Sequence, residues 1–183
     1  MYDQAVLFEG PLNSLPFLDS GVNGRVFDCG QTVVKLSHRS DRTRNWLEFS
    51  LNWREKHGTL LPLMPEIYSL VDCWGKNWRG EPAKGYIVAM KKYTRQAGHY
   101  PDRKWGADDR ALIQNHPAFD DVSGAYTEYL SRRCASSRDV RCLFDDCHGD
   151  NIMMEGKRPI ILDPSNGTYI EPYAPSVLEL EMA

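Results

Sequence analysis

The feature that most constrains this sequence is a run near its C-terminal end, residues 143–164, which reads LFDDCHGDNIMMEGKRPIILDP. Its two short apolar segments, 151–154 and 159–162, flank a Glu-Gly-Lys turn, a pattern typical of a β-hairpin. Asp146 and Asn151 therefore lie on a loop that precedes the hairpin, and Asp163 follows the end of the hairpin. We expect these two carboxylates and one carboxamide at one edge of a small sheet.

Such a set suits phosphoryl transfer. This reaction needs a carboxylate to orient the attacking hydroxyl, and oxygen ligands that hold Mg²⁺ against the phosphates. Asp146 is predicted to be the base, and Asn151 and Asp163 the metal ligands. The spacing of Asp, four residues, Asn, hairpin and Asp is that of a kinase catalytic loop. The competing interpretation is a solvated loop, because Asp and Asn are frequent in turns.

The first half of the chain contains a possible phosphate-binding unit. Residues 17–27 follow the pattern strand, Gly-rich turn, strand, with Gly21 and Gly24 in the turn. Glycines there let backbone amides approach an anion. The β-branched strand 32–36 comes next and contains Lys35, which would reach phosphate oxygens beneath the turn. The alternative is a lysine on an edge strand that extends into solvent.

A helix capped by Ser40 or Asp41 is expected after this strand, running to about His57 with Gly58 just past its end. Its carboxylates include Glu48 and Glu55, and either could pair with Lys35. We prefer Glu48, because it adjoins the apolar stripe that faces the sheet. Both glutamates could instead face water, and for Glu55 we favour that interpretation.

The remaining pattern predicts an α+β fold. Strands are expected at 66–73 and 85–93, so five strands and one helix precede residue 94 and indicate an antiparallel sheet. A short helix is plausible at 108–115, and a second helix is expected from Ser123 to about residue 135.

Composition excludes several classes of protein. The chain has 183 residues, which favours one domain, or one domain in two lobes. Its net charge of −3 and lack of a basic block argue against bulk electrostatic binding to nucleic acid. No apolar run has the length of a membrane span, and the N-terminus lacks the features of a secretory signal.

Cysteine usage favours a reducing compartment. The five cysteines are an odd number and widely scattered, as expected for reduced thiols in a cytosol, so we expect a cytoplasmic protein. Cys142, Cys147 and His148 are near one another in the sequence, but a structural zinc site needs four ligands and no second pair is present.

The order of these parts resembles the protein-kinase-like fold, over roughly residues 17–164. The text around Asp146, D-x-H-x-x-N-I-M followed by a hairpin and L-D-P, is most similar to the small early protein kinases of bacteriophages. Aminoglycoside and choline phosphotransferases share the Asp-x-His-x2-Asn pattern. The resemblance implies a bilobal molecule, with an antiparallel-sheet N-lobe at 1–93, a reduced helical C-lobe at 94–183, and ATP between them.

The resemblance also implies roles for individual residues, with ATP and Mg²⁺ as cofactors. Lys35 would contact the α- and β-phosphates and be held by Glu48. Asp146 would be the catalytic base, and Asn151 and Asp163 would bind Mg²⁺. The residues implied to surround the nucleotide are Gly21, Asn23, Gly24, Val26, Lys35, Glu48, Met90, Lys91 and Tyr93.

The sequence departs from the family pattern at several positions. Asp150, in His-Gly-Asp, is a second candidate base, but the residue five positions beyond it is Glu155, so spacing favours Asp146. Phe144 replaces the usual His or Tyr two residues before the base. Twenty residues follow Asp163, so we expect the activation segment and peptide-docking helices to be missing or vestigial.

Three functions follow as expectations. The first is a Mg²⁺·ATP-dependent serine/threonine protein kinase of bacteriophage type, acting in the host cytoplasm on protein hydroxyls. The second is a kinase-like protein without catalysis that binds and inhibits a host protein. The third is a small-molecule phosphotransferase. The expected partners are therefore ATP and a protein substrate or host target, without specific nucleic-acid binding and without a membrane.

Overall fold

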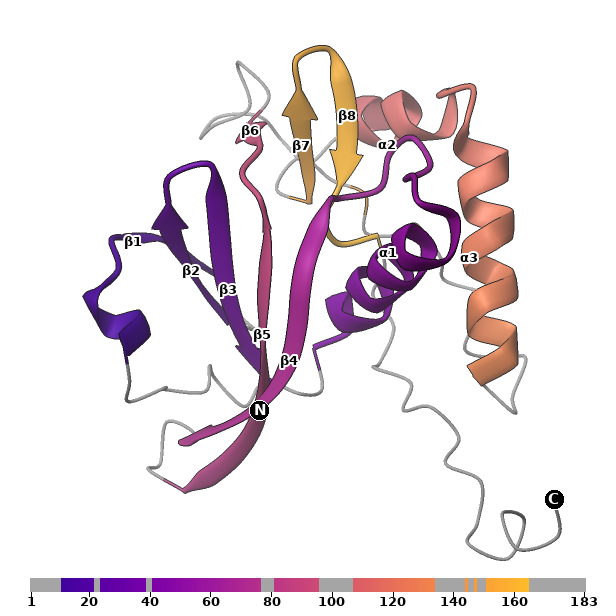
Figure 1. Cartoon of the computed structure of the whole chain (residues 1–183). Helices are drawn as coiled ribbons and strands as arrows, with labels where there is room; N and C mark the ends of the chain where they lie inside the picture. The colour runs from indigo at the N-terminus through magenta and orange to yellow at the C-terminus, as the bar shows by residue number, and fades with distance from the viewer. Residues whose placement is uncertain are drawn as a thin grey trace, which may run out of the picture.

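The structure is a computed structural model, which describes residues 11–21, 24–38, 41–76, 81–95, 107–133, 144, 147 and 151–164. These residues form an α+β fold with a five-stranded antiparallel sheet, a three-stranded sheet and three α-helices (Figure 1). Within these ranges, no helix combines the length and the apolar character that crossing a membrane requires.

The larger sheet confirms the five predicted strands. Its spatial order is β1-β2-β3-β5-β4, and every neighbouring pair is antiparallel. The strands are β1 (Phe17–Gly21), β2 (Gly24–Cys29), β3 (Thr32–His38), β4 (Ile67–Lys76) and β5 (Pro82–Lys91). β4 runs three residues past the predicted end at Cys73. It is an edge strand with one partner, so its last residues need not be apolar.

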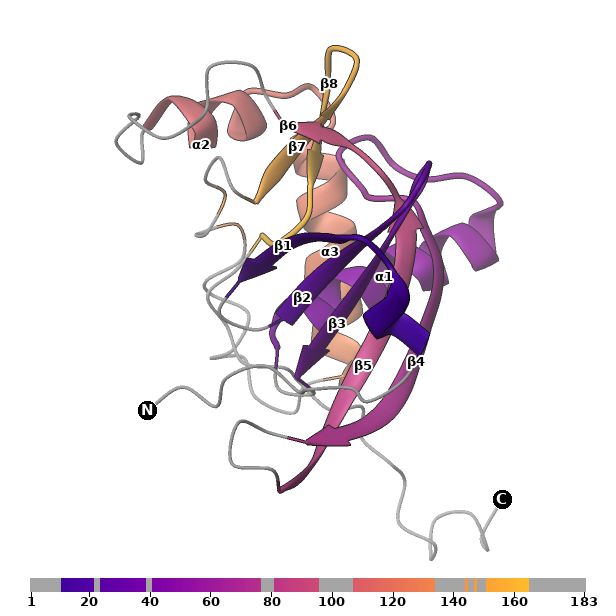
Figure 2. The ribbon, with the colours of Figure 1, turned by 90° about the vertical axis from the view of Figure 1, so that its left-hand side faces the viewer.

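The first helix, α1 (Thr43–His57), lies between the five-stranded sheet and α3 (Phe119–Arg133) (Figures 1 and 2). It ends at Gly58, which has the left-handed φ of 71° typical of a helix C-cap. Leu47 packs in the sheet core, whereas Trp46 and Phe49 pack in a second core with the helices and the hairpin. A single helix therefore joins both cores.

The second half contains a small sheet and two helices. Strands β6 (Thr94–Arg95), β7 (Ile152–Glu155) and β8 (Arg158–Ile161) form the sheet, and α2 (Ala107–Gln114) precedes α3. A short 3₁₀ helix, η1 (Pro11–Ser14), precedes β1. The predicted hairpin is confirmed, with its turn at Gly156-Lys157. The two-residue strand β6 was not predicted, because so short a segment has no periodicity to detect.

The predicted start of α3 was wrong. Ser123 does not cap this helix but lies inside it, where its hydroxyl donates a hydrogen bond to the carbonyl of Asp120 at 3.2 Å. The helix begins at Phe119 and carries Asp120 and Asp121 in its first turn. Carboxylates there are favoured by the positive end of the helix dipole, which explains why the helix extends to include them.

Aromatic rings fill the second core and hold the hairpin against α1. Trp46 contacts Tyr126 and Phe144 edge to face, and its Nε1–H donates to the carbonyl of Ile161 at 2.7 Å. Phe144 is buried although it has a φ of 66°, a left-handed conformation that is costly for a bulky residue. Its packing therefore stabilises a strained backbone two residues before Asp146.

We expect Phe144→Ala to lower the free energy of unfolding by about 3–5 kcal/mol, the usual cost of deleting a buried Phe. Phe17→Ala is the matched control, because Phe17 is 60% exposed and Phe144 is 3% exposed. Urea unfolding of both variants measures the difference. Equal losses in the two variants would contradict the anchoring role of Phe144.

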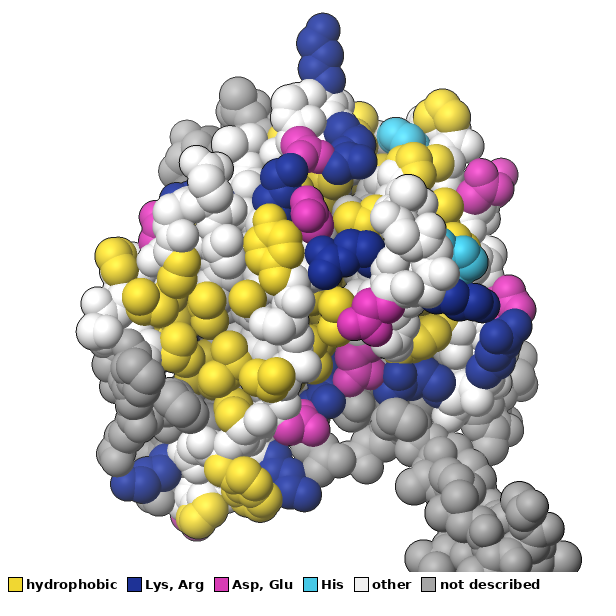
Figure 3. Space-filling model, viewed as in Figure 1, with side chains coloured by type: hydrophobic (Ala, Val, Ile, Leu, Met, Phe, Trp, Pro, Cys, Tyr) yellow, Lys and Arg dark blue, Asp and Glu magenta, His cyan; other side chains and the backbone are white. Residues whose placement is uncertain are grey.

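The surface differs between the two sheets (Figure 3). Charged side chains of both signs intermingle around the hairpin, where Lys91 pairs with Glu155 and Glu66, and Arg158 pairs with Glu155. Apolar side chains gather over the five-stranded sheet. Exposed residues on its two edge strands include Phe17, Leu18, Tyr68, Val71 and Trp74.

Candidate functional site

Lys35 lies on the inner face of the five-stranded sheet. It is directly opposite Val26 on β2 and Val88 on β5, so the three side chains share one face. Val88 packs with Leu47 of α1, which identifies this face as the one that the helix covers. Because β3 lies between β2 and β5, the edge-strand interpretation of Lys35 was wrong. Two residues predicted to bind nucleotide, Val26 and Lys35, are thus adjacent.

The ionic partner of Lys35 is Asp41. Lys35 Nζ lies 3.1 Å from Asp41 Oδ2, and the two side chains are 21% and 0% exposed. Tyr86 donates its hydroxyl to the same oxygen at 2.9 Å, and the Thr43 amide donates to Oδ1 at 3.1 Å. Burial opposes ionisation of Asp41, but Lys35 and these donors outweigh it, so the pKa of Asp41 falls below its ordinary value.

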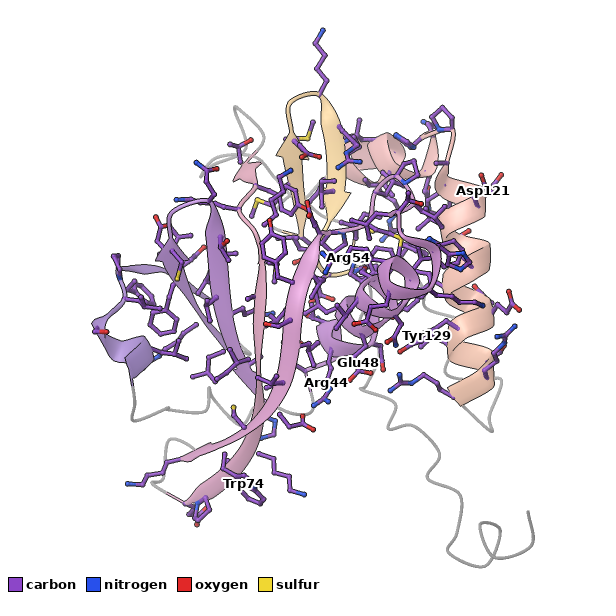
Figure 4. All side chains as sticks on the ribbon, viewed as in Figure 1. Arg44, Glu48, Arg54, Trp74, Asp121 and Tyr129 are labelled. Carbon is purple, nitrogen blue, oxygen red and sulfur yellow. The ribbon has the colours of Figure 1, made fainter. Side chains whose placement is uncertain are left out.

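The predicted pairing of Lys35 with Glu48 was therefore wrong. Glu48 pairs with Arg44 at 2.6 Å and with Arg133 at 2.7 Å, and Arg44 also reaches Asp72 on β4. Figure 4 shows Arg44 and Glu48 side by side on α1, near Tyr129 of α3. The physical reason is position along the helix. At 1.5 Å per residue, Glu48 lies about 7 Å beyond Thr43 along the axis, whereas Asp41 precedes the first turn.

Asp163 follows β8 and meets the start of α1. Thr43 Oγ1 donates to its Oδ2 at 2.7 Å, across 120 residues of sequence. Its other oxygen, Oδ1, is buried and has no hydrogen-bond partner among the described residues. Burial raises the pKa of Asp163 to about 6, and the charge of Asp41 adds to this, while Lys35, Thr43 and Arg42 act in the opposite direction.

A chain of contacts connects the strand lysine of the first half with the carboxylate that follows the hairpin of the second half. Lys35 pairs with Asp41, Asp41 accepts the amide of Thr43, and the Thr43 hydroxyl donates to Asp163. The charge of Lys35 accordingly opposes the rise in the pKa of Asp163. Lys35, Asp41 and Asp163 thus form one partly buried group of charges at the N-terminal end of α1.

Asn151 lies at the same end of the hairpin as Asp163. Its carbonyl accepts a hydrogen bond from the Leu162 amide at 2.7 Å, which extends the pairing of Ile152 with Ile161 by one step. The expected grouping of Asn151 and Asp163 at one edge of the small sheet is therefore present in the backbone. The predicted base, Asp146, lies outside the described residues, although Phe144 and Cys147 on either side of it are both buried in the second core.

The Gly-rich turn is described in part. Gly21 pairs with Gly24 where β1 and β2 meet the turn, and Asn23 lies outside the described residues. A Cβ on Gly24 would lie 2.3 Å from the carbonyl oxygen of Leu36. Gly24 is thus required for the close packing of β2 on β3, a reason that is independent of any bound anion.

The segment predicted to meet the adenine already uses two of its backbone amides. Lys91 N–H donates to the carbonyl of Glu66 at 3.0 Å, and Lys92 N–H donates to that of Gln31 at 2.9 Å. Tyr93 accepts a bond from the Glu66 amide at 2.7 Å. An adenine ring bound at this segment would therefore have to hydrogen-bond to backbone groups other than these two amides.

The donor set fits Mg²⁺ better than a transition metal. Among the described residues, no three His, Cys, Asp or Glu side chains gather as a metal site. Mg²⁺ commonly takes one or two protein carboxylates and completes its shell with phosphates and water. Asp163 has one buried oxygen without a partner among the residues that the structure describes, and Asn151 lies at the same end of the hairpin, so the two match that requirement.

Sequence reasoning missed three contributors to this site: Asp41, Thr43 and Tyr86. A signal existed only for Asp41, which was predicted as a possible helix cap. The N-cap of α1 is instead Arg42, so that prediction was wrong, although Asp41 Oδ1 accepts the Thr43 amide from one position earlier. Comparison of the chain with protein-family models and with curated proteins finds no match.

Proposed function

We propose that this chain is a bilobal kinase-like phosphotransferase that uses Mg²⁺ and ATP. The observation that carries the proposal is the link between Lys35 and Asp163, from opposite halves of the chain, through Asp41 and Thr43. With it goes the buried Asp163 oxygen that lacks a partner within the described ranges. A lysine for phosphates and a carboxylate for a divalent cation, side by side, are the protein groups that hold a metal-bound nucleotide in this chemistry.

Each residue has a role in the proposed reaction. Bound Mg²⁺·ATP would supply the transferable γ-phosphoryl group and neutralise its charge. Lys35 holds phosphate oxygens, and Asp41, rather than Glu48, holds Lys35. Asp163 and Asn151 are the metal ligands. Asp146 orients the acceptor hydroxyl and takes its proton, and the similarity to phage kinases favours serine and threonine of proteins as acceptors.

The charge states agree with these roles near neutral pH. With a pKa of about 6, Asp163 is ionised at pH 7.5 and is a competent metal ligand. The Lys35 side chain remains 21% exposed although it is paired with Asp41. The lowered pKa of Asp41 keeps its charge opposite Lys35.

The direct test is transfer of label from γ-labelled ATP to the protein itself and to a mixture of cellular proteins. We expect Asp146→Asn to lower the rate by about 10²–10⁴-fold, the usual contribution of a general base. Asp150→Asn is the matched control, because it removes a carboxylate from the same loop and should leave the rate near that of the wild type. Loss of transfer in Asp150→Asn but not in Asp146→Asn would reverse the assignment.

The exposed apolar residues of the edge strand β4 favour a second candidate, a kinase-like protein that binds and inhibits another protein. Tyr68, Val71 and Trp74 are all exposed on this strand. An edge strand of this kind is suited to pairing with a partner. The labelling experiment separates the candidates. Binding alone is favoured if the wild-type protein transfers no label and if the Asp146→Asn variant still inhibits the partner.

A further inference from the structure

Thr43 connects the two carboxylates of the site. Its backbone amide donates to Asp41 Oδ1 at 3.1 Å, and its hydroxyl donates to Asp163 Oδ2 at 2.7 Å. Thr43 is itself buried, with 3% exposure. One residue at the first turn of α1 thus fixes the partner of Lys35 and the carboxylate that follows the hairpin.

We propose that Thr43 is a positioning residue, whose hydroxyl orients Asp163 so that Oδ1 is presented to a divalent cation. This inference rests on the proposed function. A carboxylate has two oxygens, and the Thr43 hydroxyl engages only Oδ2. The other oxygen, buried and without a hydrogen-bond partner in the described part of the chain, is the one left for a ligand. Such outer-shell donors orient metal ligands in many proteins.

The hydroxyl also keeps two opposite charges apart. Lys35 is linked to Asp163 through Asp41 and Thr43, yet its ion pair within the described ranges is with Asp41. If Asp163 turned to pair with Lys35 directly, a phosphate-binding cation and a metal-binding anion would neutralise each other. The hydrogen bond from Thr43 to Oδ2, together with the Lys35–Asp41 pair, opposes that collapse.

Substitution at Thr43 separates the hydroxyl from the shape of the side chain. Thr43→Val keeps the shape and removes the donor, whereas Thr43→Ser keeps the donor. Thr127→Val is the matched control, because the Thr127 hydroxyl also donates one 2.7 Å hydrogen bond, to the Ser123 carbonyl in α3. Circular dichroism and thermal unfolding establish that each full-length variant is folded.

The first readout is binding of Mn²⁺ alone, followed by electron paramagnetic resonance of the free ion. The second is the Mg²⁺ concentration that gives half-maximal transfer from ATP. Removing an outer-shell partner typically costs 10–100-fold in metal affinity. We therefore expect Thr43→Val to raise both the dissociation constant for Mn²⁺ and the half-maximal Mg²⁺ concentration about 10–100-fold. The transfer rate at saturating Mg²⁺ should fall less, and Thr43→Ser and Thr127→Val should stay close to the wild type.

Unchanged Mn²⁺ binding in folded Thr43→Val protein, or a Thr43→Ser variant as weak as Thr43→Val, would overturn the inference while leaving the proposed function intact. Wild-type protein that neither binds Mn²⁺ nor transfers phosphate would overturn both. If Thr43→Val does not fold, Thr43→Ala takes its place. Should both fail to fold while Thr43→Ser folds, the role of the hydroxyl is structural and the inference is wrong.

Discussion

Metal-free Asp163→Asn protein is expected to be more stable than the wild type at pH 7.5 and yet to transfer no phosphate. Burial raises the pKa of Asp163 from 3.8 to about 6, so the folded protein carries a buried carboxylate that the unfolded chain would ionise more easily. A shift of about two pKa units corresponds to about 3 kcal/mol. Asparagine removes this charge and can still accept the Thr43 hydroxyl, but it cannot serve as an anionic metal ligand.

The sign of the pH dependence is specific. Between about pH 4 and pH 6 the native wild type binds more protons than the unfolded chain, so its stability falls as pH rises. The stability of Asp163→Asn lacks this decrease. Urea unfolding in the presence of a chelator, from pH 4.5 to 7.5, measures the free energy of unfolding of both proteins. The variant should be the more stable, by a difference that increases with pH and becomes constant above about pH 7.

Mg²⁺ and ATP provide the complementary control. A ligand in large excess over its dissociation constant stabilises a folded protein by about 2–4 kcal/mol, and only the wild type should gain this amount. The gap seen without metal should then shrink or reverse. A variant that is no more stable than the wild type at pH 7.5 without metal, or that still transfers phosphate, would show that Asp163 is not a buried metal ligand.

Lys35→Met is expected to be the most destabilising single change at the site. It removes the ammonium that lies 3.1 Å from Oδ2 of Asp41, whose side chain is fully buried. Breaking a buried ion pair from one side typically costs about 3–5 kcal/mol, because an uncompensated charge remains. Adding Asp41→Asn should recover much of that loss. Transfer should be lost in both proteins, because neither has a cation for the phosphates.

A second double variant tests the identity of the partner. If Asp41 holds Lys35, combining Lys35→Met with Glu48→Gln should recover nothing, since Glu48 pairs with Arg44 and Arg133 instead. Chemical denaturation of the two double variants and their single parents gives both coupling energies. Recovery with Glu48→Gln and none with Asp41→Asn would restore the pairing that the sequence suggested.

Much of the fold was predictable because its signals are local. The β-branched run of β3, the Gly-Lys turn of the β7–β8 hairpin and the glycine after α1 each depend on a few neighbouring residues. The same locality explains the errors. Ser123 was chosen as a cap from its residue type, whereas the two aspartates before it extend α3 by four residues.

The candidate site was predictable in its parts but not in its pairing. Lys35 and Asp163 were identified from residue type and order, and the structure brings them near each other. Asp41 and Glu48 were both available as carboxylates close to α1, and sequence reasoning selected the wrong one. The choice depends on the distance between Lys35 and each carboxylate. That distance is set by how α1 packs against β3, which the spacing of residues in the sequence does not define.

The sequence by itself determined the five strands of the larger sheet, the β7–β8 hairpin, the end of α1 and the polar side chains that follow the hairpin, because periodicity and turn chemistry act between neighbours. Only the tertiary structure decided that Asp41 holds Lys35, that Thr43 holds Asp163, and that Asp163 has a raised pKa. The physical reason is that ion pairing and burial depend on distances between elements far apart in the chain. Those distances exist only after α1 has packed against both sheets.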